Sequence, residues 1–228
     1  MFCNYQDKGC ASHDFPQRGW VICVAMQQHP SHQPRQRQAK TRVPIHRPIA
    51  DRWSPRAFDP EAVVTKEILT GLLEAARWAA TWGRRQPVRF VVGARGDETY
   101  HRLAALLNRG NAYATNAGAL ILVCADEGDD DPTAIYSAVD AGAAAANLAI
   151  EAVSRGLVCH PMAGFDAAGA RSAFGVPPQV RPLMIIAVGS LADPAEVPPD
   201  IAERDSLPRE RLPLEQVAFA STWGQPWR

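Results

Sequence analysis

One stretch of this chain carries almost no bulky side chain on any side of a helix. From Tyr136 to Arg155 most positions are filled by alanine, glycine and other small residues. A helix that is small and apolar all round is normally buried, and small residues let two backbones approach closely. The sequence therefore predicts a helix over 136–155, capped by Gly156, at the centre of the fold, where it could also meet a second copy of the chain.

Strand-like and helix-like segments alternate around this helix. Three apolar runs have the length of strands and lie at 88–92, 119–125 and 183–188. The run at 119–125 is apolar throughout, which is typical of a strand buried on both faces. Apolar residues at helical spacing predict helices over 65–79, with Thr65 as the cap, over 97–107 and over 165–172. This alternation indicates an α/β or α+β layered fold.

The composition is that of an ordinary soluble globular protein. The 228 residues include 24 Lys and Arg against 24 Asp and Glu, so the formal net charge is zero. A neutral chain argues against nucleic acid or an anionic membrane as the main partner. The longest early apolar run, 20–26, is far shorter than the roughly 18 residues of a membrane-spanning helix and lacks the features of a secretory signal.

Five cysteines, an odd number at irregular spacing with no CxxC pair, make a disulfide framework improbable and favour a reducing cytoplasm. Cys3, Cys10 and His13 lie close together and could in principle meet a metal. Zinc sites usually show paired short spacings, so incidental thiols in a flexible terminus are the preferred interpretation. No metal site is predicted.

The two ends of the chain differ from its middle. Residues 1–42 are predicted to form a disordered basic tail, because the later part of this segment has almost no apolar residue to bury. Residues 43–228 are predicted to form one domain. Its last forty residues are rich in proline and read as an extended arm, which must lie across another surface such as a partner subunit.

Motifs for hydrolytic or nucleotide chemistry are absent from the sequence. There is no P-loop, HExxH, GxSxG or GxGxxG. The acidic run 126–131 lacks the spacing and terminal Glu of a calcium loop and is predicted to be a solvated loop. His101 is predicted to be exposed, and His160 to be a structural or surface residue. No catalytic residue is predicted.

Arginine stands out instead. Arg52 and Arg56 flank Trp53 and Ser54 before the first long helix, and a second pair, Arg209 and Arg211, lies in the C-terminal arm. Guanidinium groups form bidentate, charge-assisted bonds with phosphate oxygens. The two clusters could grip one phosphate from two sides, although solvated surface arginines would look the same in a sequence.

A series of short motifs, in order from about Arg47 to Pro213, resembles the nitroreductase family of flavin enzymes. They are Arg52-Trp-Ser-Pro-Arg-Ala-Phe58, Glu74-Ala-Ala-Arg-Trp-Ala79, Gln86-Pro-Val-Arg-Phe-Val-Val92, Asp140-x-Gly142 with Asn147-Leu148, Gly156-Leu157, Gly164-Phe-Asp166, Val188-Gly189 and Leu207-Pro-Arg-Glu-Arg-Leu-Pro213. The resemblance implies an α+β sandwich with a central, mostly antiparallel sheet. It also implies a homodimer with FMN at the subunit interface and arms exchanged between subunits.

The resemblance further implies a ping-pong oxidoreductase. NAD(P)H would reduce FMN by hydride transfer, and the reduced flavin would then reduce a small-molecule acceptor such as a nitro compound or a quinone. The flavin carries the difficult step, which is consistent with the lack of a catalytic triad in the sequence.

Residue roles carry over only where positions match. The resemblance places Arg52, Arg209 and Arg211 at the FMN phosphate, and Ser54 and Arg56 near the ribityl chain and the pyrimidine edge. A cation at Arg56 would stabilise the anionic reduced flavin. Ala163 and Gly164 match the turn whose backbone N–H faces flavin N5. Trp53, Arg84 and Gln86 complete the cofactor-binding set that the sequence predicts.

The loop 80–88 departs from the family pattern. The family usually has Pro-Ser, then Asn, then Gln-Pro-Trp, whereas this chain has Ala80-Thr81, Arg84 and Gln86-Pro87-Val88. Arg84 offers only donors in place of an amide. It could raise affinity for the reduced flavin, contact the phosphate of NADPH, or block the site. A catalytically degenerate relative that binds or sequesters flavin therefore stays as the alternative function, with a structural role for the basic tail behind it.

Overall fold

The computed structural model describes residues 37–227, and Cys3, Cys10 and His13 lie outside that range. Its centre is a four-stranded sheet in the order β1-β2-β4-β3, in which every neighbouring pair is antiparallel. The strands are β1 (Val88–Ala94), β2 (Ala119–Asp126), β3 (Val158–Met162) and β4 (Val180–Gly189). The prediction of an α+β fold with a mostly antiparallel sheet is confirmed.

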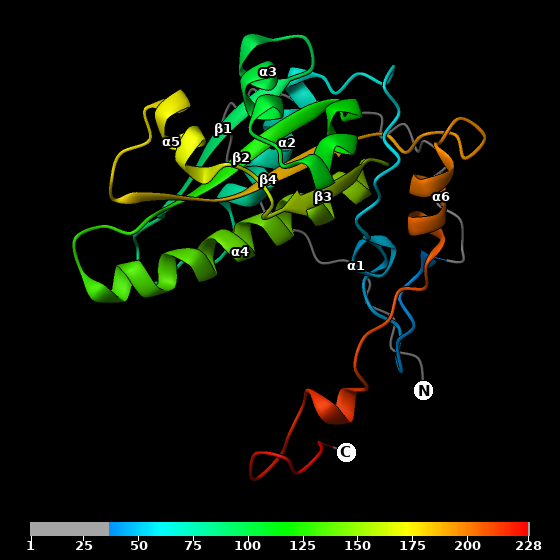
Figure 1. The fold of residues 1–228 in the computed structure, drawn as a ribbon. Coiled ribbons are helices and arrows are strands. Elements are labelled where there is room, and N and C mark those ends of the chain that lie inside the picture. Colours follow the sequence, from blue (N-terminus) through cyan, green and yellow to red (C-terminus); the bar gives the residue numbers. More distant parts are fainter. Residues whose placement is uncertain (1–36, 228) are drawn as a thin grey trace, which may run out of the picture.

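Helices cover both faces of the sheet (Figure 1). Along β2 the side chains alternate between two cores, so Ile121 and Val123 face α2 (Lys66–Arg77) and α4 (Asp131–Ser154). Leu120 and Leu122 face α3 (Glu98–Ala105) and α5 (Ala167–Phe174). The uniformly apolar run of β2 therefore reflects burial on both faces, as the sequence predicts.

Side-chain caps begin the helices close to the predicted places. The Thr65 hydroxyl accepts from the Ile68 amide at the start of α2, and the Asp97 and Asp166 carboxylates accept from amides at the starts of α3 and α5. Gly156, with φ of 77°, follows α4 in the left-handed region that favours glycine. These local signals account for most element boundaries.

Helix α4 corrects two predictions. It begins five residues before Tyr136, because Asp130 caps it through the Thr133 amide, so part of the acidic run belongs to the helix end rather than to a solvated loop. The prediction that this helix is buried all round is also wrong for a single chain, because Ile135 and Val139 are 65% and 63% exposed. The sheet and α2 cover only one side of α4, the side that contains Ala141, Ala144 and Leu148.

The C-terminal part runs beside the start of the described chain (Figure 1). After β4 come α6 (Pro199–Ser206), an extended arm and a short 3-10 turn, Leu214–Gln216. The arm contacts residues 37–42: Arg37 donates to the Leu207 carbonyl at 2.8 Å, and Arg42 pairs with Glu215. Helix α1 (Arg47–Asp51) follows this segment. Among the described helices, none is long and apolar enough to cross a membrane.

Candidate functional site: a cavity lined by arginines

Arginines separated by more than 150 residues in sequence line one cavity of about 420 Å³. We call it the arginine cavity. Its guanidinium groups come from the segment before α1, from the turn after α1, from α6 and from the arm. The lining residues include Arg37, Arg52, Trp53, Ser54, Arg204, Asp205, Arg209 and Arg211. The structure thus brings Arg52 of the first sequence cluster together with Arg209 and Arg211 of the second, and it adds Arg37 and Arg204. Arg56 does not line this cavity.

Arg209 anchors this arrangement. Its guanidinium donates to the Ala50 carbonyl at 2.9 Å and to the Arg52 carbonyl at 2.7 Å, and also to the carbonyl of Arg37. Burial lowers the pKa of Arg209, and the nearby positive charges of Arg52, Arg211 and Arg37 lower it further. The site therefore holds positive charge that the protein compensates only in part, which favours an anion.

The carboxylate in the cavity wall is already engaged by backbone groups. Asp205 accepts from the Arg56 amide at 2.8 Å and from the Ala57 amide at 3.0 Å. Within residues 37–227, none of the arginines lining the cavity forms an ion pair with an Asp or Glu. Asp205 therefore holds α6 against the turn after α1 and leaves the guanidinium groups available.

Arg56 lies against an aromatic and histidine pair. Its Cζ is 5.4 Å from the centre of the Tyr113 ring, and the Tyr113 hydroxyl is 3.2 Å from His160 Nε2. His160 Nδ1 is 2.8 Å from the Pro55 carbonyl, so Nδ1 carries the proton as donor and Nε2 accepts from Tyr113. Burial lowers the pKa of His160, which keeps the imidazole neutral. His160 is partly buried, and His101 is exposed as the sequence predicts.

The turn after β3 is held by its carbonyl. Gly164 O accepts from the Asn108 amide at 3.1 Å and from Asn111 Nδ2 at 2.8 Å. A Cβ on Gly164 would lie 2.8 Å from Asn111 Nδ2, so a side chain there would push the asparagine away. Ala163 is exposed beside it. The turn is thus rigid and open to a ligand that approaches its backbone.

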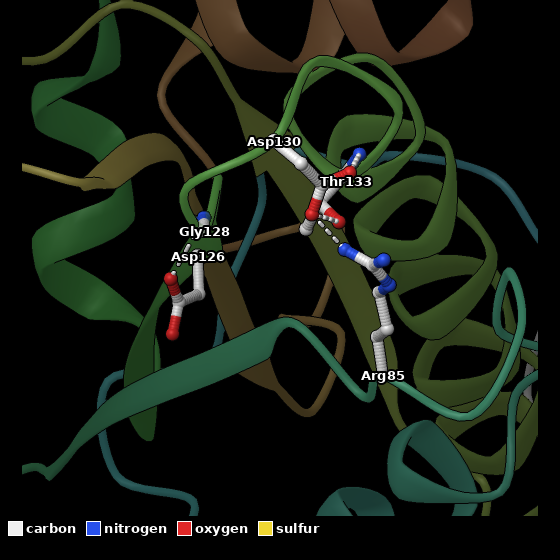
Figure 2. Close-up of polar contacts among 5 residues, drawn as sticks. All are labelled: Arg85, Asp126, Gly128, Asp130 and Thr133. Atoms are coloured by element: carbon white, nitrogen blue, oxygen red, sulfur yellow. Dashed lines mark hydrogen bonds and ion pairs between the residues drawn. The ribbon is translucent and has the colours of Figure 1, made fainter.

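The loop 80–88 lies apart from the arginine cavity within one chain. Its backbone is held to α4, since the Trp82 amide donates to the Asp140 carboxylate at 3.0 Å and Arg85 pairs with Asp130 (Figure 2). Arg84 is exposed, and Gln86, with φ of 52°, lines a second cavity of about 500 Å³. Neither Arg84 nor Gln86 joins the residues that line the arginine cavity.

Several residues of the site escaped prediction from the sequence. Arg37 lies in a polar segment that reads as a tail, and Asp205 is one carboxylate among many. Tyr113 and Asn111 lie in the 3-10 segment Arg109–Asn116, which has no motif. Their positions depend on packing between distant segments, so only the three-dimensional structure reveals them. Within residues 37–227, no group of three His, Cys, Asp or Glu side chains could hold a metal ion.

An antiparallel sheet between two layers of helices, with a cationic cavity at one end, defines a class of α+β protein suited to a phosphate-bearing ligand. Comparison with family models narrows this class. The model described as the nitroreductase family matches residues 49–116 and 97–190, which together span more than half of the chain. The chain belongs to the nitroreductase family.

Individual relatives agree with this assignment. A 15.4 kDa uncharacterised protein of Mycolicibacterium smegmatis is 61% identical over 147 residues, which cover 61% of this chain and 99% of that protein. A Leptothrix cholodnii protein with the provisional name NADH dehydrogenase/NAD(P)H nitroreductase is 30% identical over 160 residues, 60% of this chain and 79% of its own length.

Solved structures share the fold. An oxidoreductase described as containing FMN is 34% identical, with a TM-score of 0.75 over 82% of this chain and 96% of that chain. A provisionally named nitroreductase of Exiguobacterium sibiricum, solved in complex with FMN, has a TM-score of 0.66 over 81% of this chain and all of its own. At 20% identity, this second likeness shows the fold alone.

Proposed function

We propose that the protein is an FMN-dependent oxidoreductase of nitroreductase type. It takes reducing equivalents from NAD(P)H and passes them to a small-molecule acceptor such as a nitro compound or a quinone, in a ping-pong scheme. We further propose that it acts as a homodimer in the cytoplasm. The observation that carries the proposal is the gathering, around one cavity, of arginines that form no ion pair with a carboxylate among residues 37–227, in a chain of this family.

The residues of the cavity fit the phosphate end of FMN. A phosphate monoester is a dianion near neutral pH, and the cavity presents several guanidinium groups whose charge is not neutralised by neighbouring acids. Two buried donors in its wall also have no acceptor among the described residues. A neutral or cationic ligand would leave this positive charge uncompensated.

The chain's own residues have distinct roles in this proposal. Arg52, Arg209 and Arg211 bind the phosphate, and Ser54, which accepts from Arg52 at 3.3 Å, lies next to them. Arg56 provides positive charge at the ring edge, held in place by Tyr113. The rigid turn at Gly164 presents its backbone to the cofactor. When bound, FMN would supply the hydride and electron transfer chemistry that no side chain of the protein can supply.

The exposed side of α4 supports a homodimer. Ile135, Val139, Gly142 and Ala146 are all exposed and recur at helical spacing, which makes an apolar stripe that no element within residues 37–227 covers. Soluble monomers rarely expose such stripes. The arm also exposes Trp223 and Trp227. A second subunit would cover both regions and could bring Arg84 and Gln86 to the cofactor from the partner.

Gly142 offers a test of the dimer. A Cβ at this position would meet nothing within 4 Å, so Gly142→Arg should leave the single chain folded while it disrupts close packing between two copies. We expect the wild type to elute as a dimer and the variant as a folded monomer with reduced FMN content, measured by light scattering and absorbance. A dimeric variant with full FMN content would exclude α4 as the interface.

The alternative is a relative that holds flavin without turnover. Arg84 favours it, because a charged and exposed side chain stands where the family resemblance implies an asparagine that bonds the flavin ring. This alternative keeps the phosphate roles of the arginine cavity and removes only the reaction with NAD(P)H.

One experiment separates these functions. The purified protein, reconstituted with FMN, should be yellow, bleach on addition of NADPH or NADH without oxygen, and recover its colour in air. A yellow protein indifferent to both nucleotides would select the sequestering function. A colourless protein whose thermal stability does not change with added FMN would reject both.

A further inference from the structure

Two hydrogen-bond donors in the wall of the arginine cavity have no acceptor among the described residues. They are Arg37 Nη2 and Trp53 Nε1, and both atoms are buried. Trp53 as a whole is only 7% exposed. A buried donor without an acceptor is costly, and such a group in a native structure calls for an explanation, one of which is a role toward a bound ion or water.

The two donors are held together rigidly. The Arg37 guanidinium stacks on the Trp53 ring, with 4.3 Å between Cζ and the ring centre, and its Nη1 donates to the Leu207 carbonyl at 2.8 Å. The Arg37 carbonyl in turn accepts from Arg209. Stacking and backbone contacts thus orient the guanidinium plane and leave its second terminal nitrogen without an acceptor in the part of the chain that the structure describes.

Both residues lie next to open space. Arg37 and Trp53 line the arginine cavity, and they also line an adjoining cavity of about 280 Å³ between α6 and the residues after β4. Both polar atoms are closed to a water-sized group in this structure, so an anion in the cavity would reach them through a shift of the side chains around them.

Arg37 precedes the first residue matched by the family model, residue 49. Its approach to the cavity depends on the segment 37–42 lying along the arm. The roles implied by the family resemblance include Arg52, Arg209 and Arg211 but give no role to Arg37.

We infer that Arg37 and the indole N–H of Trp53 form an additional phosphate subsite, which binds oxygens of the same phosphate monoester dianion as Arg52, Arg209 and Arg211. The inference rests on the proposed function where it takes FMN as the source of that phosphate. It extends the phosphate-binding site to a segment outside the family-matched region, so the N-terminal segment helps to retain the cofactor.

The charges around the site agree with a dianion as the ligand. The cavity is lined by five arginines and two carboxylates, and one of these carboxylates, Asp205, is engaged by backbone amides. A single negative charge would leave most of the guanidinium groups uncompensated. A phosphate monoester supplies two charges and three acceptor oxygens, enough to engage groups from several segments at once.

The test compares Arg37→Ala and Trp53→Phe with the wild type, using the full chain. Trp53→Phe keeps an aromatic ring for stacking and removes only the N–H donor. Arg47→Ala is the matched control, because it removes the same charge from a side chain that is exposed and paired with Asp51. Three probes are titrated: FMN, riboflavin, which lacks the phosphate, and inorganic phosphate added to the FMN-free protein.

We expect Arg37→Ala to raise the Kd for FMN by about 10- to 100-fold, and Trp53→Phe by about 3- to 10-fold. The Kd for riboflavin should stay within about twofold of the wild type in both variants, since riboflavin has no group for the subsite. The increase in Tm caused by inorganic phosphate should shrink in both variants and persist in Arg47→Ala.

Three results would decide against the inference or separate it from the proposed function. Wild-type affinity for FMN and phosphate in both variants would overturn the subsite and leave the oxidoreductase proposal intact. Equal losses of FMN and riboflavin affinity would overturn it too, because they indicate a structural role. If phosphate stabilises the wild type, the variants lose that effect and FMN does not bind, the subsite stands and the FMN proposal fails.

Discussion

The arginine cavity and the surface around β1 are both rich in arginine, yet they differ in how the charge is compensated. Near β1, Arg77 pairs with Glu74, Arg85 with Asp130, and Arg89 with Asp126. Figure 2 shows the second of these pairs beside the cap of α4. In the arginine cavity, by contrast, the guanidinium groups contact backbone carbonyls and aromatic rings.

The difference shows what distinguishes a ligand site from ordinary surface charge. Exposed ion pairs contribute little to stability and leave no charge for a partner. Guanidinium groups brought together repel one another, and burial together with this repulsion lowers the pKa of Arg209. A fold retains such an arrangement at a cost in stability, which a bound anion would relieve. Lack of a carboxylate partner is therefore a better signal than arginine density.

The largest expected effect follows from removing an unpaired guanidinium. Arg52→Ala should weaken FMN binding by about 2–5 kcal/mol, while the fold persists because Arg209 bonds the backbone carbonyl of Arg52 rather than its side chain. Arg77→Ala, which removes an arginine paired with Glu74, is the control and should leave FMN affinity within about twofold. Fluorescence titration measures the FMN affinity of both variants. Equal losses of affinity would show that paired and unpaired arginines do not differ in their effect on FMN.

A smaller effect is expected from the carboxylate of the cavity. Asp205→Asn replaces an acceptor of the Arg56 and Ala57 amides with a neutral group, which should lower the free energy of unfolding by about 1–3 kcal/mol. FMN affinity should hold or improve, since the cavity becomes more positive. Denaturant unfolding and FMN titration check the two parts. Loss of FMN affinity without loss of stability would mean that Asp205 serves the ligand.

Asp130, on the surface where arginines are paired with carboxylates, should affect mainly stability. Asp130→Ala removes the acceptor for the Thr133 amide and hydroxyl at the start of α4, so Tm should fall slightly. Because Asp130 also pairs with Arg85 of the loop 80–88, FMN affinity should change less than in Arg52→Ala. Those hydrogen bonds hold the pKa of Asp130 below its usual value, so its contribution is present above the unfolded pKa and is lost on acidification. Calorimetry across pH tests this, and a large loss of FMN affinity would contradict it.

The smallest effect concerns the histidine behind Arg56. Burial lowers the pKa of His160, so the unfolded chain takes up a proton at a higher pH than the folded protein does. Stability should therefore decline as pH falls through the ordinary histidine range, and the decline should end below the folded pKa. His160→Gln should flatten this part of the profile of Tm against pH. An unchanged profile would mean that the imidazole is not held neutral by burial.

Much of the fold follows from local signals in the sequence. Thr65 and Asp97 mark helix starts, and the continuous apolar run of β2 predicts burial on both faces. The start of α4 was missed because the acidic run reads as a loop, although Asp130 followed by Pro132 is a cap signal with proline in the first turn. The many acids in this run favour a loop, although Asp130 and Pro132 taken individually mark the start of a helix.

The site was less predictable than the fold. The family resemblance singles out Arg52, Arg209 and Arg211, and the structure places all three around one cavity. Arg37 and Asp205 have no comparable signal, because their contacts join segments that only packing brings together. The sequence identifies residues that belong to a motif, but it does not identify residues whose role depends on contact with a distant segment.

The contact between the two ends of the described chain has a consequence for biosynthesis. Arg37 is made early, whereas the Leu207 carbonyl and the Arg209 side chain that meet it are made 170 residues or more later. The arginine cavity is therefore incomplete on a growing polypeptide until the arm has left the ribosome. Binding of FMN there would have to follow synthesis of the arm.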